Sequence, residues 1–325
     1  IERQHVQSIA LGLERVRAVL ARLELPPLAP AITVGGTNGK GSTCAILASI
    51  LGAAGYRVGS YCSPHLLRYN ERVRVCGSEA GDEALCGAFA AVDAARREIP
   101  LTYFEFGTLA ALWLFAREPL DALVLEVGLG GRLDAVNVID AGCAIVTSVD
   151  IDHVEYLGGT REAIGREKAG IFRAGCAAVV ADPRPPQSLL DEARRVGARP
   201  LRIGIDFGFC SAGTQWRYWG PGGSRHGLAF PALRGAVQLS NASAAIAALD
   251  EMRGSLPVDM QQLRRGLADV TLAGRFQVLP GRPTVVMDVA HNPQAARVLA
   301  ENLAATAAAG RVHAVFGILG DKDAA

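Results

Sequence analysis

The segment 34–43 has the composition of a phosphate-binding loop, or P-loop, since it reads Val-Gly-Gly-Thr-Asn-Gly-Lys-Gly-Ser-Thr. Glycines allow backbone N–H groups to approach a phosphate, and a lysine supplies a mobile charge for the terminal phosphates of ATP. Two positions depart from the strict pattern G-x-x-x-x-G-K-[ST], because Val34 replaces the first glycine and Gly41 stands where a hydroxyl would bind Mg²⁺. The loop therefore predicts ATP binding with a modified metal site.

Polar residues that follow apolar segments could supply the missing metal ligands. Glu126 ends one such segment, where an unpaired carboxylate would be costly, and Ser63 and the pair Asp152-His153 follow two others. Ligands in open α/β sheets lie at the carboxyl ends of the strands, so Ser63, Glu126 and His153 could meet one Mg²⁺. A second interpretation makes Glu126 a structural ion-pair partner of Arg132.

Apolar periodicity predicts alternating strands and helices around these residues. The expected strands span 31–34, 57–61, 122–127, 143–149, 284–289 and 312–318, and the expected helices span 42–54, 91–98, 105–116 and 293–305. Segment 215–219 with the glycines after it is expected to form an irregular hairpin. The alternation favours an α/β fold with a P-loop NTPase-like, mostly parallel sheet wrapped by helices, followed by a smaller Rossmann-like α/β domain.

The length of 325 residues predicts about two domains, and we expect them at 1–272 and 273–325. The second is shorter than a stable core normally requires, so we expect the chain to be an incomplete version of a longer protein.

Composition favours small-molecule partners. A net charge of +1 leaves no basic field for nucleic acid or anionic lipid. No apolar run approaches the roughly 20 residues of a membrane span and no leader peptide opens the sequence, so we expect a cytoplasmic protein, and a monomer. Seven scattered cysteines without a C-x-x-C pair predict no disulfide framework and no zinc site; we expect them reduced and mostly buried.

Several motifs resemble, in order, those of the bifunctional dihydrofolate synthase/folylpolyglutamate synthase family of the Mur ligase superfamily. They are the segments 36–42, 63–66 with 69–73, 125–135, 152–153 and 165–172, with further similar positions at Asn241, 274–277 and 288–293. The resemblance extends from about Gly12 to the last residue.

The resemblance implies an ATP-dependent ligase that adds L-glutamate to dihydropteroate, forming dihydrofolate, and to tetrahydrofolate, extending a polyglutamate chain. A substrate carboxylate would attack the γ-phosphate of ATP, and the glutamate amine would then displace phosphate from the acyl phosphate. Implied cofactors are ATP and Mg²⁺ at two sites, with a monovalent cation such as K⁺ as a further candidate.

By the same resemblance, the ATP-binding residues are Thr37, Asn38, Gly39, Lys40, Gly41, Ser42, Thr43, Asn241, Arg275, Asp288 and His291. The implied metal ligands are Ser63, Glu126 and His153, with a carbamylated Lys168 at a second metal. The implied catalytic residues are Lys40, His153, Lys168 and His291. The implied folate-binding residues are Thr102, Phe104, Asp134 and Ala135.

Some of these assignments have a simpler alternative. From spacing alone, Lys168 is a solvated helix lysine paired with glutamate. Asp288 and His291 could cap the next helix, and Phe104 could belong to the core. Ala10 also stands where the family often has an acid able to pair with pterin nitrogens, which leaves the balance between the two ligase activities open.

Two other functions remain open. A Mur-type ligase acting on another carboxylate, such as a peptidoglycan precursor, would share the ATP chemistry but would need a UDP-sugar domain before the P-loop. A non-catalytic P-loop switch or scaffold would bind nucleotide and would need neither a glutamate site nor a metal ligand at Lys168.

Overall fold

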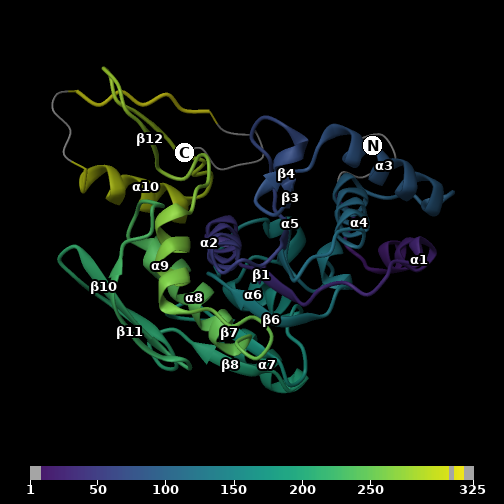
Figure 1. Cartoon of the computed structure of the whole chain (residues 1–325), viewed down its shortest axis with the longest axis horizontal. Helices are drawn as coiled ribbons and strands as arrows, with labels where there is room; N and C mark the ends of the chain where they lie inside the picture. The colour runs from purple at the N-terminus through teal and green to yellow at the C-terminus, as the bar shows by residue number, and fades with distance from the viewer. Residues whose placement is uncertain (1–8, 307–310, 318–325) are drawn as a thin grey trace.

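The computed structural model describes residues 9–306 and 311–317, and in it a large sheet lies between layers of helices (Figure 1). The sheet has eight strands in the order β4-β3-β2-β5-β1-β6-β7-β8. Its strands are β1 (Ala31–Gly35), β2 (Val58–Tyr61), β3 (Val73–Val75), β4 (Ser78–Glu79), β5 (Ala122–Glu126), β6 (Ala141–Val146), β7 (Ala177–Val180) and β8 (Arg199–Arg202). The strands from β2 to β8 in this order are parallel, and β3 and β4 form an antiparallel edge. The predicted mostly parallel sheet is confirmed.

Two smaller sheets, ten α-helices and two short 3-10 helices (Tyr69–Arg72 and Ala135–Val138) complete the described elements. The smaller sheets contain β9 (Gly208–Ala212), β10 (Gln215–Gly220) and β11 (Gly223–Ala229) in one, and β12 (Gln277–Leu279) and β13 (Val285–Met287) in the other. The α-helices are α1 (Glu14–Leu23), α2 (Lys40–Ala53), α3 (Asp82–Arg96), α4 (Tyr103–Phe115), α5 (Val154–Leu157), α6 (Arg161–Ala169), α7 (Gln187–Val196), α8 (Val237–Glu251), α9 (Met260–Asp269) and α10 (Pro293–Ala304).

Alternating strand residues divide the core between the two faces of the large sheet. Ile32 and Val124 pack with α2, α8 and α9 on one face. On the other face, Leu123 packs with α1, α3 and α4, and Ala144 and Val146 pack with α6 and α7. Successive strand side chains point to opposite faces, so a sheet covered on both sides needs apolar residues at almost every position. This requirement explains the nearly unbroken apolar strands.

β1 lies in the middle of the sheet, between β5 and β6. From β1 the chain passes through α2 to β2 on one side, and it later returns to β6 on the other side. Such a reversal opens a crevice at the carboxyl ends of the strands. The P-loop follows β1 directly, so the topology positions it in that crevice.

Two of the element boundaries differ clearly from prediction. The helix expected at 91–98 spans Asp82–Arg96, because acidic residues follow Gly81 in its first turn and Leu85, Ala88 and Val92 form its buried face. The strand expected at 143–149 ends at Val146, because the next residues turn to hydrogen-bond the P-loop. The first difference reflects local signals that the prediction did not use, and the second reflects a tertiary contact that a local pattern does not contain.

The expected hairpin at 215–219 forms between β10 and β11, with a register irregularity between Trp216 and Tyr218. β10 also pairs with β9, which the sequence did not predict. Trp216 and Tyr218 are buried against α8, which attaches this small sheet to the core. 

The C-terminal elements are more exposed than the large sheet. β12 and β13 pair only with each other among the described strands, and α10 has no buried residue within its bounds. The strand expected at 312–318 is wrong over 312–317, which are described without regular structure; position 318 lies outside the described residues. Val315 and Phe316 are exposed there, and an extended segment becomes a strand only beside a hydrogen-bonding neighbour.

Two further expectations concern the whole chain. The seven cysteines are free, but only Cys44 and Cys143 are buried, two are half-buried and three are exposed, so the expectation that most are buried is wrong. Cysteine was expected to behave as a small hydrophobe, whereas Cys76 in the turn after β3, Cys86 on α3 and Cys210 on β9 are exposed. Among the described residues, no helix is both long and apolar enough to cross a membrane.

Candidate active site

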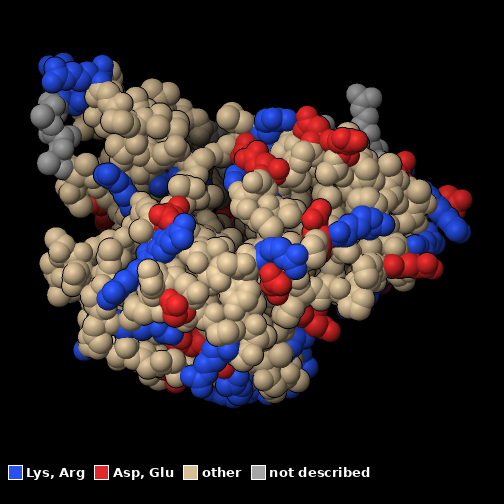
Figure 2. Space-filling model, viewed as in Figure 1, with Lys and Arg blue, Asp and Glu red and all other residues tan. Residues whose placement is uncertain are grey.

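A cleft of about 500 Å³ lies over the carboxyl ends of the central strands. The P-loop and the ends of β5 and β6 form one side, and residues of the segment 274–302 form the other. Figure 2 shows a hollow beside the C-terminal lobe at the upper left, with positive and negative residues interspersed over the face around it. All the predicted ATP-binding residues except Thr43 line the cleft, as do all four predicted metal ligands.

The P-loop owes its shape to glycines at crowded positions. Gly36 has φ +144°, and a Cβ atom there would collide with Thr147 Oγ1. Gly39 has φ +88°, and a Cβ atom would lie 2.6 Å from Asn241 Oδ1. Both positions combine a positive φ with close neighbours, so any side chain would displace the loop. The two glycines therefore allow the loop to pack closely against Thr147 and Asn241.

Lys40 is the first residue of α2 and folds over the loop. Its Nζ donates hydrogen bonds to the carbonyls of Gly36 at 3.0 Å and Thr37 at 3.1 Å. Thr43 is fully buried on the next turn, where its Oγ1 donates to Gly39 O at 3.0 Å. Lys40 therefore brings positive charge to the anion-binding loop, whereas Thr43 holds its backbone.

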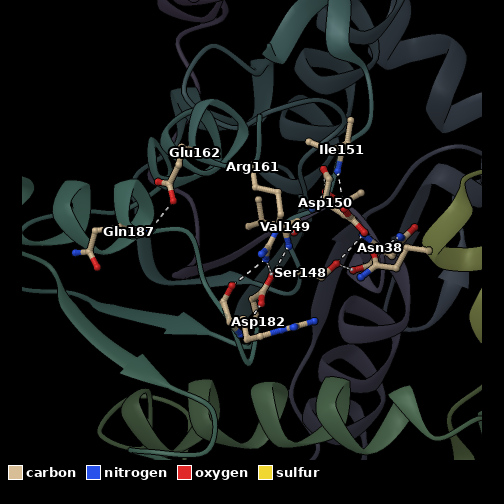
Figure 3. A network of polar contacts seen from close by, with 12 residues as sticks. Asn38, Ser148, Val149, Asp150, Ile151, Arg161, Glu162, Asp182 and Gln187 are labelled. Carbon is tan, nitrogen blue, oxygen red and sulfur yellow. Dashed lines mark hydrogen bonds and ion pairs between the residues drawn. The ribbon is translucent and has the colours of Figure 1, made fainter. Parts of the chain in front are cut away.

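A brace of polar residues that sequence reasoning missed fixes the P-loop to the strand ends (Figure 3). Asn38 N donates to Ser148 Oγ at 3.0 Å, and Thr37 N donates to Ser148 O at 2.7 Å. The loop after β6 is held in turn by buried Asp182, which accepts from Val149 N at 2.8 Å and Arg161 Nη2 at 2.9 Å. The only sequence signal was an acid after an apolar strand at Asp182, the same signal that drew attention to Glu126.

Glu126 and Ser63 lie side by side because β2 and β5 pair in register, Tyr61 with Leu125. Ser63 N donates to Glu126 Oε2 at 3.0 Å. Burial raises the pKa of the Glu126 carboxyl, and the charge of Lys40 and the Ser63 hydrogen bond act in the opposite direction. A Cβ atom at Gly41 would lie 3.7 Å from both Glu126 oxygens. Gly41, which stands where a strict P-loop has a serine or threonine, therefore faces this carboxylate.

Arg132 is not the partner of Glu126. It forms an ion pair with Glu167 at 2.8 Å. The structural ion pair considered for Glu126 is therefore wrong, and this buried carboxylate faces the cleft beside Lys40 instead.

Lys168 is buried at the end of α6, with 3% of its surface exposed, and lines the cleft. Its pKa is lowered to about 7, mainly by burial and also by the charge of Lys40, whereas Asp152 and Asp134 act in the opposite direction. The alternative of a solvated lysine paired with glutamate is wrong, since the adjacent Glu167 pairs with Arg132. With a pKa of about 7, roughly half of this amine is neutral at pH 7.

His153 precedes α5 with a φ of +51°, a conformation uncommon for residues with side chains. Its backbone N donates to Asp152 Oδ1 at 2.9 Å, and its Nε2 lies 3.9 Å from the same oxygen. Both residues line the cleft. The carboxylate and imidazole predicted at this strand end therefore face the P-loop.

Arg275, Asp288 and His291 line the opposite side of the cleft. Asp288 accepts hydrogen bonds from Phe276 N and Ala290 N, both at 2.8 Å, so it shapes its own turn. The cap of α10 is Asn292, whose side chain accepts from Ala295 N at 2.9 Å, so the alternative in which Asp288 and His291 cap this helix is wrong.

Asn38 joins the two sides of the cleft. Its Nδ2 donates to Asn292 Oδ1 at 3.1 Å and to Gln294 Oε1 at 2.5 Å, and its Oδ1 accepts from Asn292 Nδ2 at 3.0 Å. Sequence reasoning missed Gln294, and it quoted Asn292 only as part of a motif. The asparagine of the P-loop therefore contacts the C-terminal segment rather than only the loop.

The residues assigned to folate lie outside the lining of this cleft. Buried Thr102 caps α4, where its Oγ1 accepts from Glu105 N at 3.2 Å. The ring of Phe104 packs on Gly128, which does line the cleft. Asp134 accepts from Leu129 N at 2.8 Å and Val136 N at 2.9 Å, and burial raises its pKa to about 7. Phe104 and Asp134 therefore contact the segment 128–130, which itself lines the cleft.

Two family descriptions match the chain. The Mur ligase middle domain matches residues 34–249, and the Mur ligase glutamate ligase domain matches residues 274–325. The dihydrofolate synthase/folylpolyglutamate synthase of Escherichia coli K12 is 48% identical over 326 residues, which cover 100% of this chain and 76% of that protein.

Solved structures agree with these matches. E. coli FolC in complex with DHPP and ADP superposes with a TM-score of 0.94 at 48% identity, covering 99% of this chain and 77% of that one. A bifunctional folylpolyglutamate synthase/dihydrofolate synthase with Mn, AMPPNP and L-glutamate bound gives a TM-score of 0.86 at 48% identity, covering 94% of this chain and 72% of that one.

Proposed function

The chain belongs to the dihydrofolate synthase/folylpolyglutamate synthase family of Mur ligases, and from that premise we propose that its cleft joins L-glutamate to a pteroate or folate carboxylate at the expense of ATP. It is an ATP-dependent ligase of a family that binds a divalent metal and small-molecule substrates. The proposal covers both reactions of the family, the formation of dihydrofolate from dihydropteroate and the extension of tetrahydrofolate.

The chemical difficulty is that a carboxylate oxygen is a poor leaving group. In the proposed mechanism the carboxylate attacks the γ-phosphate of ATP, ADP leaves, and the glutamate amine displaces phosphate from the resulting acyl phosphate. Phosphoryl transfer is catalysed mainly by positioning and by stabilisation of charge. The P-loop amides and Lys40 would hold the β- and γ-phosphates in line with the attacking oxygen.

Ser63, Glu126 and His153 are proposed to hold one Mg²⁺. The donor set of a hydroxyl, a carboxylate and an imidazole suits a divalent cation, and Gly41 faces the Glu126 carboxylate. Mg²⁺ would neutralise phosphate charge during transfer. This arrangement would replace the hydroxyl that a strict P-loop has after its lysine.

The environment of Lys168 is the observation that best distinguishes a ligase from a non-catalytic nucleotide-binding switch. It is buried, it faces the same cleft as the P-loop, and its pKa is lowered to about 7. Only a neutral amine can add CO₂, and the resulting carbamate is a carboxylate-like ligand for a second divalent metal. A monovalent cation such as K⁺ remains a further proposed cofactor of this side of the cleft.

We propose domains at 1–272 and 273–325, with the nucleotide between them. Asn241 and Arg275 would contact ATP from the two sides, together with Asp288 and His291. Closure would exclude water from the acyl phosphate, which water would otherwise hydrolyse. A monomer is the proposed working unit.

Thr102, Phe104, Asp134 and Ala135 remain the proposed folate-side residues. Phe104 offers an aromatic face next to Gly128 of the cleft, where a planar pterin could stack. Asp134 has a pKa raised to about 7, so it can donate or accept a hydrogen bond near neutral pH. Ala10 stands where the family often has an acidic residue. The backbone carbonyl of Ala10 accepts a hydrogen bond from Arg15 Nη2 at 2.6 Å.

The test is ADP release from the full-length protein with Mg²⁺ and ATP. We expect release only when L-glutamate and a carboxylate substrate, dihydropteroate or tetrahydrofolate, are both present. Equal release without glutamate would contradict a ligase and favour a simple nucleotide hydrolase or switch. Comparing the two carboxylates in separate reactions ranks the two activities.

A further inference from the structure

A group of metal-binding atoms lies behind the proposed Mg²⁺ site. Cys44 Sγ, Cys62 Sγ and a carboxylate oxygen of Glu126 all lie within 4.8 Å of one another. No other group of three or more His, Cys, Asp or Glu side chains in the described ranges meets this condition. We refer to these three residues as the thiol cluster.

The sheet and the P-loop helix hold the thiol cluster in place. Cys62 and Glu126 directly follow Tyr61 and Leu125, which are paired in the parallel register of β2 and β5. Cys62 N donates to Arg72 O at 2.9 Å, so its backbone is fixed as well. Cys44 lies one turn after Lys40 in α2 and is fully buried against the same strands. The three ligand atoms therefore converge without any rearrangement of the backbone.

The spacing suits tetrahedral coordination. Two thiolates bound to Zn²⁺ at about 2.3 Å have sulfur atoms roughly 3.8 Å apart, within the limits of the thiol cluster. Thiolates favour Zn²⁺ and other thiophilic cations, whereas Mg²⁺ selects oxygen ligands. Glu126 lines the cleft, so a metal could enter from that side.

We propose that Cys44, Cys62 and Glu126 form a binding site for a thiophilic divalent cation, Zn²⁺ or Cd²⁺. Binding forms two metal–sulfur bonds and one metal–oxygen bond, and the two thiol protons are released to solvent. This site is distinct from the hard-cation sites of the proposed ligase reaction, although it shares Glu126 with one of them.

The shared carboxylate predicts inhibition, and this consequence alone rests on the proposed function. While Glu126 is bound to Zn²⁺ it is no longer available to Mg²⁺, so Zn²⁺ should suppress ADP release even in excess Mg²⁺. Linkage requires the converse, which is that Mg²⁺ and ATP weaken the binding of Zn²⁺.

The experiment titrates Cd²⁺ into the full-length, reduced protein and follows the ultraviolet thiolate-to-metal charge-transfer band. The exposed Cys76, Cys86 and Cys210 are replaced by Ser in the parent protein to lower the background. We expect one equivalent of Cd²⁺ to bind, and Cys62→Ser to weaken binding by at least about tenfold.

Cys176→Ser is the matched control. Cys176, like Cys62, is half-buried and interacts with a fully buried cysteine, Cys143, but it belongs to no such cluster. Its loss should leave the titration unchanged. Cys44→Ala serves as a second variant, with the thermal melting temperature as the check on folding.

The proposal is overturned if the parent shows no charge-transfer band, or if Cys62→Ser and Cys44→Ala titrate like the Cys176→Ser control. The binding readout does not depend on ligase activity, so it stands apart from the proposed function. If Cd²⁺ and Zn²⁺ bind as expected but ADP release continues, the thiol cluster is supported and the metal role of Glu126 is contradicted.

Discussion

The two sides of the cleft are built differently. The central side consists of the P-loop and the strand ends, where Glu126 and Lys168 are each only 3% exposed. The C-terminal side consists of a two-stranded hairpin and α10, a helix with no buried residue within its bounds. One side is embedded in a large parallel sheet, whereas the other is attached largely through polar contacts such as those between Asn38 and Asn292.

This difference separates two physical tasks. Groups that stabilise charge during phosphoryl transfer must be fixed before the reaction, and burial in the sheet fixes them. A side that closes over a nucleotide must move, and polar contacts can break and form again at small cost. We therefore expect changes on the central side to affect turnover and stability strongly, and changes on the C-terminal side to affect mainly the binding of ATP.

Lys40→Ala should have the largest effect. Without this charge the developing negative charge on the phosphates is no longer stabilised, and kcat should fall by about 100- to 1000-fold. The measurement is ADP release at saturating substrates. Arg194→Ala, which removes a charge from an exposed surface pair, is the control and should retain full turnover. A Lys40→Ala enzyme within tenfold of the parent would show that the central side does not carry the chemistry.

Lys168→Ala should abolish most turnover while ATP still binds. Loss of the proposed carbamate removes a metal ligand, and misplacement of reacting groups costs about 100-fold in rate. The chain has only three lysines among its 33 basic residues, two of them in this cleft, and arginine cannot supply a neutral amine at pH 7.

The carbamate has a readout of its own. The parent protein should show a carbamate signal in NMR spectra after incubation with ¹³C-bicarbonate, and Lys168→Ala should lack it. Arg166→Ala, an exposed neighbour on α6, should keep both the signal and the activity. Full turnover of the parent in CO₂-free buffer would count against the carbamate.

Asp182→Ala tests whether the brace of the P-loop is structural. Asp182 is buried and accepts hydrogen bonds from Val149, Arg161 and Arg184, so its loss leaves several donors without a partner. We expect the free energy of unfolding to fall by about 3 kcal/mol, measured by denaturant unfolding. Asp191→Ala, at an exposed surface pair, should change it by less than about 0.5 kcal/mol. Equal stability of the two variants would contradict the brace.

The central side was largely predictable from sequence. Its signals are local, because glycines next to Lys40 and an acid ending an apolar strand at Glu126 imply chemistry without knowledge of the fold. Once parallel strands are assumed, Ser63 and Glu126 must lie at the same edge of the sheet. These inferences need only the strand order near β1.

Other features depend on contacts between distant parts of the chain. Asn38 and Ser148 are 110 positions apart, and their contact exists only because β6 lies next to β1. The thiol cluster was missed for the same reason, since Cys44 and Cys62 show no metal-binding spacing in sequence. Thr102 and Asp134 were assigned to folate from the family resemblance. That assignment did not predict the local hydrogen bonds that both side chains accept from nearby backbone N–H groups.

Asn292→Ser should have the smallest effect and tests the C-terminal side directly. Serine can still cap α10, as Asn292 does through Ala295 N, but it is too short to retain the amide contacts with Asn38. The KM for ATP should rise by roughly fivefold, about 1 kcal/mol of lost hydrogen bonding, with kcat and melting temperature nearly unchanged. Arg297→Ala, exposed on the same helix, is the control. If Asn292→Ser instead lowered kcat as Lys40→Ala does, the C-terminal side would be part of the fixed catalytic framework, and the division between the two sides would fail.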